Sequence, residues 1–148
     1  MLKVLFVCSS DRTRAPMAAA LFRAMAERDG LDDWTADSAG VHAQPGQMIA
    51  PEVRTVLNER NIPCTRIGVQ LLTPKLIKSS ELILCMTSSQ EKEISKKFLV
   101  ARGKVKTLMS VTDHPTEVFD PNHLGAEKFR QCLDMMWPAV QEVVDRLK

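Results

Sequence analysis

Cys8 and Arg14 are separated by five residues and directly follow an apolar run of the chain. The segment 8–14 reads Cys-Ser-Ser-Asp-Arg-Thr-Arg. A loop of this length can curl so that successive backbone N–H groups point inward and form a cradle for an anion. These amides and the Arg14 guanidinium favour the thiolate form of Cys8, and the planar guanidinium can hold two phosphoryl oxygens. The spacing therefore predicts a nucleophilic cysteine facing a bound phosphoryl group.

The same string also has a purely structural interpretation, because short patterns of this kind occur by chance. Cys8 would then be a buried thiol that closes a strand, and Arg14 would be solvated on the first turn of a helix. The position of the string between an apolar strand and a helix favours the chemical interpretation. A helix N-terminus adds the positive end of its dipole to an anion site.

Thiol-based hydrolysis of a phosphate ester needs a second group, which protonates the leaving oxygen and then activates water. Two Asp residues lie in the polar segment 110–125: Asp113, before a His-Pro pair, and Asp120, before Pro121. Proline restricts the backbone of the residue before it, which favours a fixed position for Asp120. Both residues also suit a plain turn-forming role, so residue type alone leaves the choice between them open.

The elements that must position these residues follow from hydrophobic periodicity. The run 2–7 predicts a buried parallel strand. A helix over 17–29 starts near Pro16 and ends at Gly30. The other predicted strands cover 34–39, 82–86 and 105–108, and the other predicted helices cover 51–60, 72–79, 88–98 and 126–147. Thr73 is expected to cap the helix over 72–79, and two serines, Ser88 and Ser89, the helix over 88–98.

This alternation of strands and helices predicts one fold class. We expect a three-layer α/β/α domain over residues 1–148, with a central four-stranded parallel sheet and a phosphate loop between the first strand and the first helix. Ligands of such sheets bind at the carboxyl ends of the strands, where Cys8 is placed.

Composition limits the partners and the compartment. The 148 residues carry 20 basic and 18 acidic side chains, a net charge of +2, which argues against binding to nucleic acid or to a membrane surface. The four cysteines have neither CxxC nor zinc spacing, so we expect reduced thiols, no metal and no cofactor. The N-terminal apolar run is too short for a signal peptide, and a cytoplasmic protein is predicted.

Four motifs together resemble the low-molecular-weight protein phosphatases, and the resemblance covers essentially the whole chain. The first is the strand and loop 4–8 with Arg14 and the Pro-Met-Ala segment 16–18. The others are Asp-Ser-Ala-Gly at 37–40, the segment 82–87, and Asp120-Pro121. The segments 38–45 and 86–87 lean toward the bacterial branch, which includes protein-arginine phosphatases.

The resemblance implies a role for each matching residue. Cys8 would be the nucleophile that becomes a phosphocysteine, Arg14 would bind phosphate and stabilise the transition state, and Asp120 would be the acid and then the base. The resemblance thus selects Asp120 over Asp113. It also implies that the loop amides bind phosphate and that Ser38 braces the loop; the residues that supply those amides are Ser9, Ser10, Asp11, Arg12 and Thr13.

Several positions depart from the family pattern. Asp11 stands where the family has Asn, and its charge should raise the pKa of Cys8 and weaken anion binding. Ala15 replaces a Ser that supports the thiolate, a loss of ~1.5–3 kcal/mol. Thr13 replaces a second loop Cys, which excludes a protective disulfide there. Arg12 is a bulky cation at a position that is aliphatic or Thr in the family, and we expect it to pair with Asp11.

The pocket rim also differs from that of tyrosine-selective members, which often carry aromatic residues after the Asp-Pro pair. Asn122 and His123 stand there in this chain, and the sequence contains no Tyr. His42 and His123 are rim candidates whose ordinary interpretation is that of solvated loop residues.

The predicted function is a cysteine-dependent phosphomonoester hydrolase acting on phosphoproteins, with phosphotyrosine as the leading substrate and phosphoarginine as the alternative. An alternative of another class is a catalytically weakened module that binds phosphate or a partner, which Asp11 and Ala15 motivate. Arsenate reduction is disfavoured, because Cys85 in its apolar strand has no predicted partner for a disulfide relay. A monomer or a weak dimer is expected.

Overall fold

The computed structural model describes residues 1–113 and 115–148, so His114 of the predicted loop lies outside the described residues. Its four strands are β1 (Leu2–Cys8), β2 (Trp34–Gly40), β3 (Leu82–Cys85) and β4 (Val105–Thr107). All pairings are parallel, in the order β2-β1-β3-β4. The helices are α1 (Arg14–Arg28), α2 (Pro51–Glu59), α3 (Pro74–Lys78), α4 (Ser88–Lys97) and α5 (Ala126–Leu147), with short 3-10 turns η1 (Leu99–Ala101) and η2 (Leu108–Val111).

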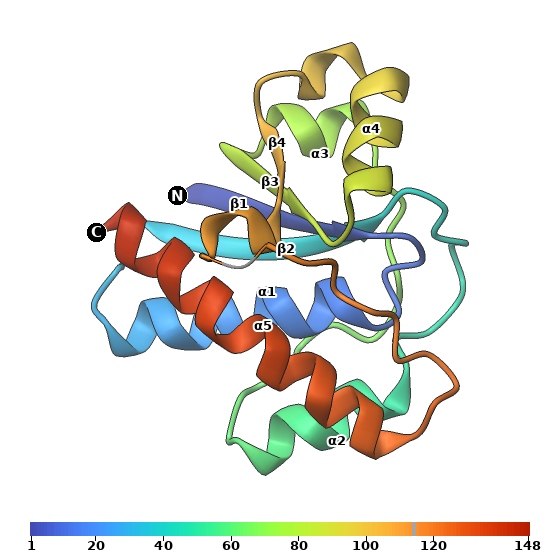
Figure 1. Ribbon diagram of the computed structural model, residues 1–148, viewed down its shortest axis with the longest axis vertical. Helices are drawn as coiled ribbons and strands as arrows, with labels where there is room; N and C mark the ends of the chain where they lie inside the picture. The colour runs from blue at the N-terminus through green and yellow to red at the C-terminus, as the bar shows by residue number, and fades with distance from the viewer. Residues whose placement is uncertain (114) are drawn as a thin grey trace.

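Helices cover both faces of the sheet, which confirms the predicted three-layer α/β/α architecture. Figure 1 shows α1, α2 and α5 on one side of the sheet and α3 and α4 on the other. Successive side chains of β1 point to opposite faces of the sheet, so they pack against different helical layers. Val4 and Phe6 pack in the cluster that includes α1 and α5, whereas Leu5 and Val7 pack in the cluster that includes α3 and α4.

The boundaries differ from the predicted ones where local caps decide them. Helix α1 begins at Arg14, three residues before the predicted start, because a proline is tolerated in the first turn and Pro16 does not interrupt it. Thr73 caps α3 as predicted, accepting a hydrogen bond from the Leu76 amide. The predicted serine caps of α4 are wrong: Thr87 is the N-cap, in a capping box with Gln90.

No helix among residues 1–113 and 115–148 has the length and apolar character needed to cross a membrane.

The phosphate loop packs against the end of β2 with no room for a side chain. Gly40 is in register with Cys8, the last residue of β1. A Cβ built on Gly40 would lie 2.7 Å from the Ser9 carbonyl oxygen and 2.8 Å from the Asp11 amide nitrogen. These are backbone atoms, which cannot rotate away as a flexible side chain does.

We therefore expect Gly40→Ala to displace the loop and to lower the free energy of unfolding by about 1–3 kcal/mol. Gly68→Ala is the matched control, because its added Cβ would meet no atom closer than the Gln47 carbonyl oxygen at 3.7 Å. Denaturant unfolding of both variants measures the difference. Equal stability of the two variants would contradict the described packing.

Candidate active site

The loop between β1 and α1 is held from outside by the segment that follows β2. Three backbone amides of this segment donate hydrogen bonds to three loop carbonyls. They are Val41 N–H to the Cys8 oxygen at 3.0 Å, His42 N–H to the Ser9 oxygen at 2.8 Å and Ala50 N–H to the Arg12 oxygen at 2.9 Å. The carbonyls of three of the loop's peptide groups therefore face outward.

The orientation of these carbonyls fixes the orientation of the amides. A trans peptide group is planar, and its N–H points opposite to its C=O. The amides of Ser9, Ser10 and Thr13 therefore point to the inner side of the loop. Asp11 closes the curve with a φ of 59°, a left-handed conformation that Asp tolerates better than most residues. The result is an inward-facing set of amides of the kind that binds anions.

Cys8 ends β1 where this loop begins, and it is buried to 1% exposure. Burial raises the pKa of the Cys8 thiol, and the Asp11 carboxylate adds to the increase, as the sequence predicts. The Arg14 guanidinium opposes it, as do backbone N–H groups of Ala15 and Asp11. Ala15 thus supports the sulfur through its backbone, although it has no hydroxyl.

Arg14 is buried at the start of α1, and one of its guanidinium N–H groups has no hydrogen-bond partner among the described residues. Its Nη1 donates to the Val118 carbonyl oxygen at 2.9 Å, and its Nη2 lies 3.8 Å from Oδ2 of Asp120. Its Nε is buried and has no hydrogen-bond partner among the described residues. A buried guanidinium N–H without a partner is costly, and a phosphoryl oxygen would satisfy it.

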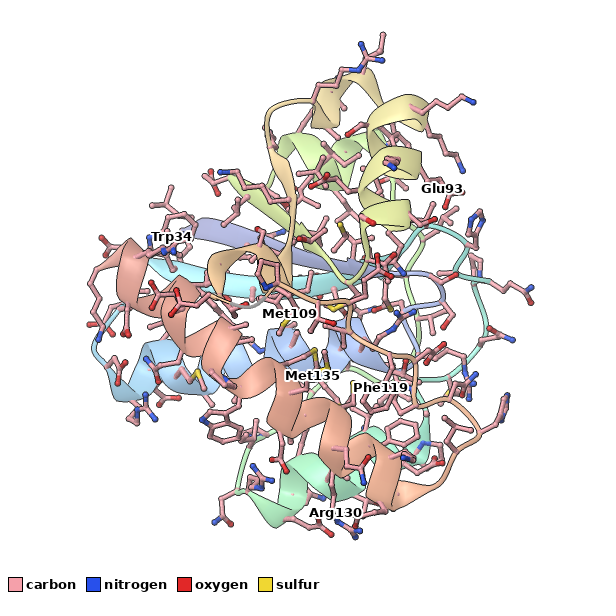
Figure 2. The ribbon with its side chains drawn as sticks, in the orientation of Figure 1. Trp34, Glu93, Met109, Phe119, Arg130 and Met135 are labelled. Atoms are coloured by element: carbon pink, nitrogen blue, oxygen red, sulfur yellow. The ribbon has the colours of Figure 1, made fainter. Side chains whose placement is uncertain are left out.

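Asp120 lies 106 positions after Arg14 in the chain, and the fold places it beside the loop. The Thr13 hydroxyl donates to Oδ1 of Asp120 at 2.9 Å, and the Asn122 amide donates to the same oxygen at 3.1 Å. The side chain remains 42% exposed, so a substrate can reach it. Figure 2 shows the neighbouring Phe119 on the segment that leads into α5. Asp113, the other candidate acid, is exposed.

Arg12 does not pair with Asp11, which corrects the sequence-based expectation. Its Nε donates to the Met48 carbonyl oxygen at 3.0 Å and its Nη1 to Oδ1 of Asn122 at 2.9 Å. The side chain therefore links the loop to the Met48 segment and to Asn122, two residues after Asp120.

Asp11 is fully buried, at 0% exposure, on the side of the loop that faces β2. Its Oδ2 accepts hydrogen bonds from the Gln70 amide at 2.9 Å and from Nη2 of Arg66 at 3.2 Å. Burial raises the pKa of Asp11 to about 6, and Ser38, Gln70 and Arg66 moderate the increase. Oδ1 is buried and has no hydrogen-bond partner among the described residues.

The rim candidates His42 and His123 are both exposed. The side chain of His42 contacts Glu93 of α4, labelled in Figure 2, with Nε2 2.6 Å from Oε2. His123 is exposed, with a φ of 66°. Ser9 and Ser10 lie half-buried on the loop.

The described residues contain no group of three or more His, Cys, Asp or Glu side chains that could hold a metal ion. All four cysteines are free thiols. Cys85 places its Sγ 3.4 Å from the Lys106 carbonyl oxygen, and Cys132 places its Sγ 3.6 Å from that of Phe119. These contacts are those of structural thiols.

The parallel sheet, the C-x5-R loop and the adjoining carboxylate together define an α/β protein built to hold an anion. Comparison with known proteins names the family. The model of the low molecular weight phosphotyrosine protein phosphatases matches residues 3–148. The chain belongs to this family and is therefore a phosphatase, a hydrolase acting on phosphoproteins.

Individual relatives fall in both branches of that family. A protein-arginine-phosphatase of Bacillus subtilis is 34% identical over 146 residues, 98% of this chain and 96% of that protein. The crystal structure of a YwlE mutant from Bacillus subtilis has a TM-score of 0.92 at 32% identity, covering 99% of both chains. A low molecular weight protein tyrosine phosphatase from T. tengcongensis also has a TM-score of 0.92, at 26% identity over 99% of both chains.

Sequence reasoning missed the residues that hold the loop from a distance. Arg66 and Gln70 were not candidates, and the contact of Thr13 with Asp120 was not anticipated. The one local signal was the Asp-Ser-Ala-Gly motif at 37–40, because Asp37 accepts hydrogen bonds from both Arg66 and Gln70.

The raised pKa of Asp11 makes stability depend on pH with a definite sign. An acid whose pKa is higher in the folded chain than in the unfolded chain destabilises the fold when it ionises. The penalty is absent below the unfolded value of 3.8 and complete above about 6. We expect the free energy of unfolding, relative to Asp11→Asn, to fall by roughly 2–3 kcal/mol from about pH 3.5 to about pH 7.5. Urea titrations of both proteins at each pH measure it, and parallel pH curves would refute the assignment.

Proposed function

We propose that this chain hydrolyses phosphomonoesters on proteins through a phosphocysteine at Cys8, with Arg14 and Asp120 as the other catalytic residues. The observation that carries the proposal is the hydrogen bond from Thr13 to Asp120, because it fixes a carboxylate beside the loop that contains Cys8 and Arg14. The free Nε of Arg14 and the inward amides supply the anion site. The match of the family model over 3–148 supports the same chemistry.

The first step forms the bond between the Cys8 sulfur and phosphorus and breaks the bond between phosphorus and the substrate oxygen. The amides of Ser9, Ser10 and Thr13 and the Arg14 guanidinium stabilise the charge on the phosphoryl oxygens. Protonated Asp120 gives its proton to the leaving oxygen, so the alcohol or phenol departs neutral.

The second step returns the enzyme to its starting state. Ionised Asp120 takes a proton from a water molecule, whose oxygen attacks phosphorus and releases the Cys8 thiolate with inorganic phosphate. The exposure of Asp120 suits this role, because both the leaving group and the water reach it from solvent. Thr13 and the Asn122 amide hold the same oxygen of Asp120 and leave the other for the proton.

Phosphotyrosine is the proposed substrate, and phosphoarginine is a second candidate that one observation favours. That observation is the 34% identity to a protein-arginine-phosphatase over nearly the whole chain. Arg12 argues against phosphoarginine, because a fixed guanidinium at the loop would face a substrate that carries a guanidinium of its own. Phe119, beside Asp120, is 37% exposed and offers an apolar face to a phenyl ring.

We further propose that the protein works in the cytoplasm as a monomer or a weak dimer, without nucleic-acid or membrane partners. The nearly balanced charge and the four free thiols support this setting.

The catalytic assignment predicts the behaviour of two variants with p-nitrophenyl phosphate. Cys8→Ser should abolish hydrolysis, because a hydroxyl at this position is a far weaker nucleophile. Asp120→Ala should lower kcat by about 10²–10⁴-fold, the range of a lost general acid. Asp113→Ala, which removes a carboxylate from the same loop, is the control and should keep the wild-type rate.

Full activity in Cys8→Ser would overturn the proposal. A clean, reduced wild-type protein that binds phosphate but does not turn over would instead favour the weakened binding module.

The substrate proposal predicts a larger kcat/KM for a phosphotyrosyl peptide than for a phosphoarginyl peptide of the same sequence. Arg12→Thr should narrow the difference by about tenfold, because removing the repulsion of one like charge at a protein surface is worth on the order of 1.4 kcal/mol. Steady-state phosphate release from both peptides measures it. A preference for phosphoarginine in the wild type would reverse the assignment.

A further inference from the structure

The phosphate loop of this chain contains a buried carboxylate next to the place where an anion must bind. Asp11 is at 0% exposure, and its charge acts on the Cys8 thiol. A buried negative charge is costly by itself and also repels a phosphoryl group. The loop therefore needs a nearby cation that offsets Asp11 without occupying the anion site.

Arg66 is that cation, and it comes from the connection between α2 and α3. Its Nη2 donates to Oδ2 of Asp11 at 3.2 Å and to the Gly68 carbonyl oxygen at 2.9 Å. Its Nη1 donates to Oδ1 of Asp37 at 2.6 Å and to the Ser38 carbonyl oxygen at 3.3 Å. One guanidinium thus ties the turn of the loop to β2 and to its own segment.

Gln70 completes the arrangement. Its backbone amide donates to Oδ2 of Asp11 at 2.9 Å, and its side-chain amide donates to Asp37 at 3.1 Å and to the Ser38 carbonyl oxygen at 2.9 Å. An ionised Asp11 accepts from both Arg66 and Gln70, whereas a protonated Asp11 is a weaker acceptor. The contacts therefore favour the ionised form, against the cost of burial.

We propose that Arg66 is a positioning residue of the phosphate loop, which holds the Asp11 carboxylate in its ionised form against β2, and that ionisation of Asp11 weakens anion binding. The inference rests on the proposed function in one respect only, the loop as the phosphate site. It assigns to Arg66 a role in the reaction although Arg66 touches neither the substrate nor Cys8.

The charged and titratable groups that face Asp11 come from three directions. Arg66 approaches from the α2–α3 connection, Asp37 from β2, and the Cys8 thiol from the end of β1. Asp37 shares the guanidinium of Arg66, and its charge raises the pKa of Asp11. Arg66 is the one group of the three whose removal would raise the pKa of Asp11.

Sulfate binding to a Cys8→Ser protein tests the inference without needing catalysis. Sulfate keeps its double charge across the pH range of the test, and the serine removes the titration of the thiol. Amide chemical shifts of the loop, followed from about pH 5 to about pH 8.5, give the dissociation constant at each pH. We expect affinity to fall by about threefold to tenfold as pH rises through about 6, the pKa of Asp11.

The Arg66→Gln variant should show the same fall in affinity with its midpoint moved at least about one pH unit higher. Arg66→Lys, which keeps the charge, should return the midpoint toward that of the parent protein. If Arg66→Gln does not fold, the midpoint of Arg66→Lys still tests the inference. Asp11→Asn, alone or with Arg66→Gln, should abolish the fall. Arg60→Gln removes an arginine paired with Asp134 on α5, and this control should leave the midpoint unchanged.

An unchanged midpoint in Arg66→Gln, a fall that persists in Asp11→Asn, or no sulfate binding at the loop would each overturn the inference. A uniform loss of affinity at every pH in Arg66→Gln would indicate a merely structural brace and would also overturn it. The proposed function can fail while this inference holds. Sulfate binding with the expected midpoints, together with no hydrolysis by the Cys8 protein, would sustain the inference and refute the function.

Discussion

Three hydrogen bonds from the segment after β2 to the carbonyls of the phosphate loop determine the rest of the site. They turn three peptide groups so that the carbonyls face the protein and the amides face the ligand. The segment can reach the loop because β2 is the immediate neighbour of β1 and ends in register with it. Gly40, which has no side chain, allows the two backbones to meet. The order of the strands thus determines where the anion site forms, independently of the catalytic side chains.

The charges of the site are balanced over a larger region than the loop. Arg14 and the N-terminus of α1 favour an anion and a thiolate, whereas burial and Asp11 oppose both. Arg66, from another connection, offsets Asp11 on the side away from the ligand. Because burial raises the pKa of both Cys8 and Asp11, the ligand-free site holds less negative charge at mildly acidic pH than exposed side chains of the same types would. This coupling makes the loop more sensitive to pH than one with a neutral amide at position 11.

The sequence was informative wherever a feature is local. The apolar run that ends at Cys8, the polar loop and the following helix are contiguous, so their order and roles could be predicted from one stretch. The same holds for β1 and β3, whose apolar, largely buried runs need no partner to be recognised. Asp120 was selected over Asp113 only by resemblance, because both are loop carboxylates with the same local chemistry.

The contacts that complete the site lie between residues that are far apart in the chain. Arg66 and Asp11 are 55 positions apart, and Thr13 and Asp120 are 107 positions apart. No periodicity links such pairs, because tertiary packing alone brings them together. Arg12 illustrates the resulting error: its neighbour in sequence, Asp11, was the expected partner, yet Asn122, 110 positions away, is the actual one. Adjacent residues of a curved loop point to opposite sides, so sequence proximity misled the expectation.

The most direct test of the central claim is to trap the covalent intermediate on this loop. An Asp120→Asn protein can still transfer phosphorus to sulfur from an activated aryl phosphate, but it cannot activate water, so the intermediate should accumulate. Rapid acid quenching followed by peptide mass spectrometry would locate the phosphoryl group. We predict that it is found on Cys8 alone. Turnover without any phosphorylated cysteine, or phosphorylation at another residue, would contradict the assignment of this loop as the catalytic site.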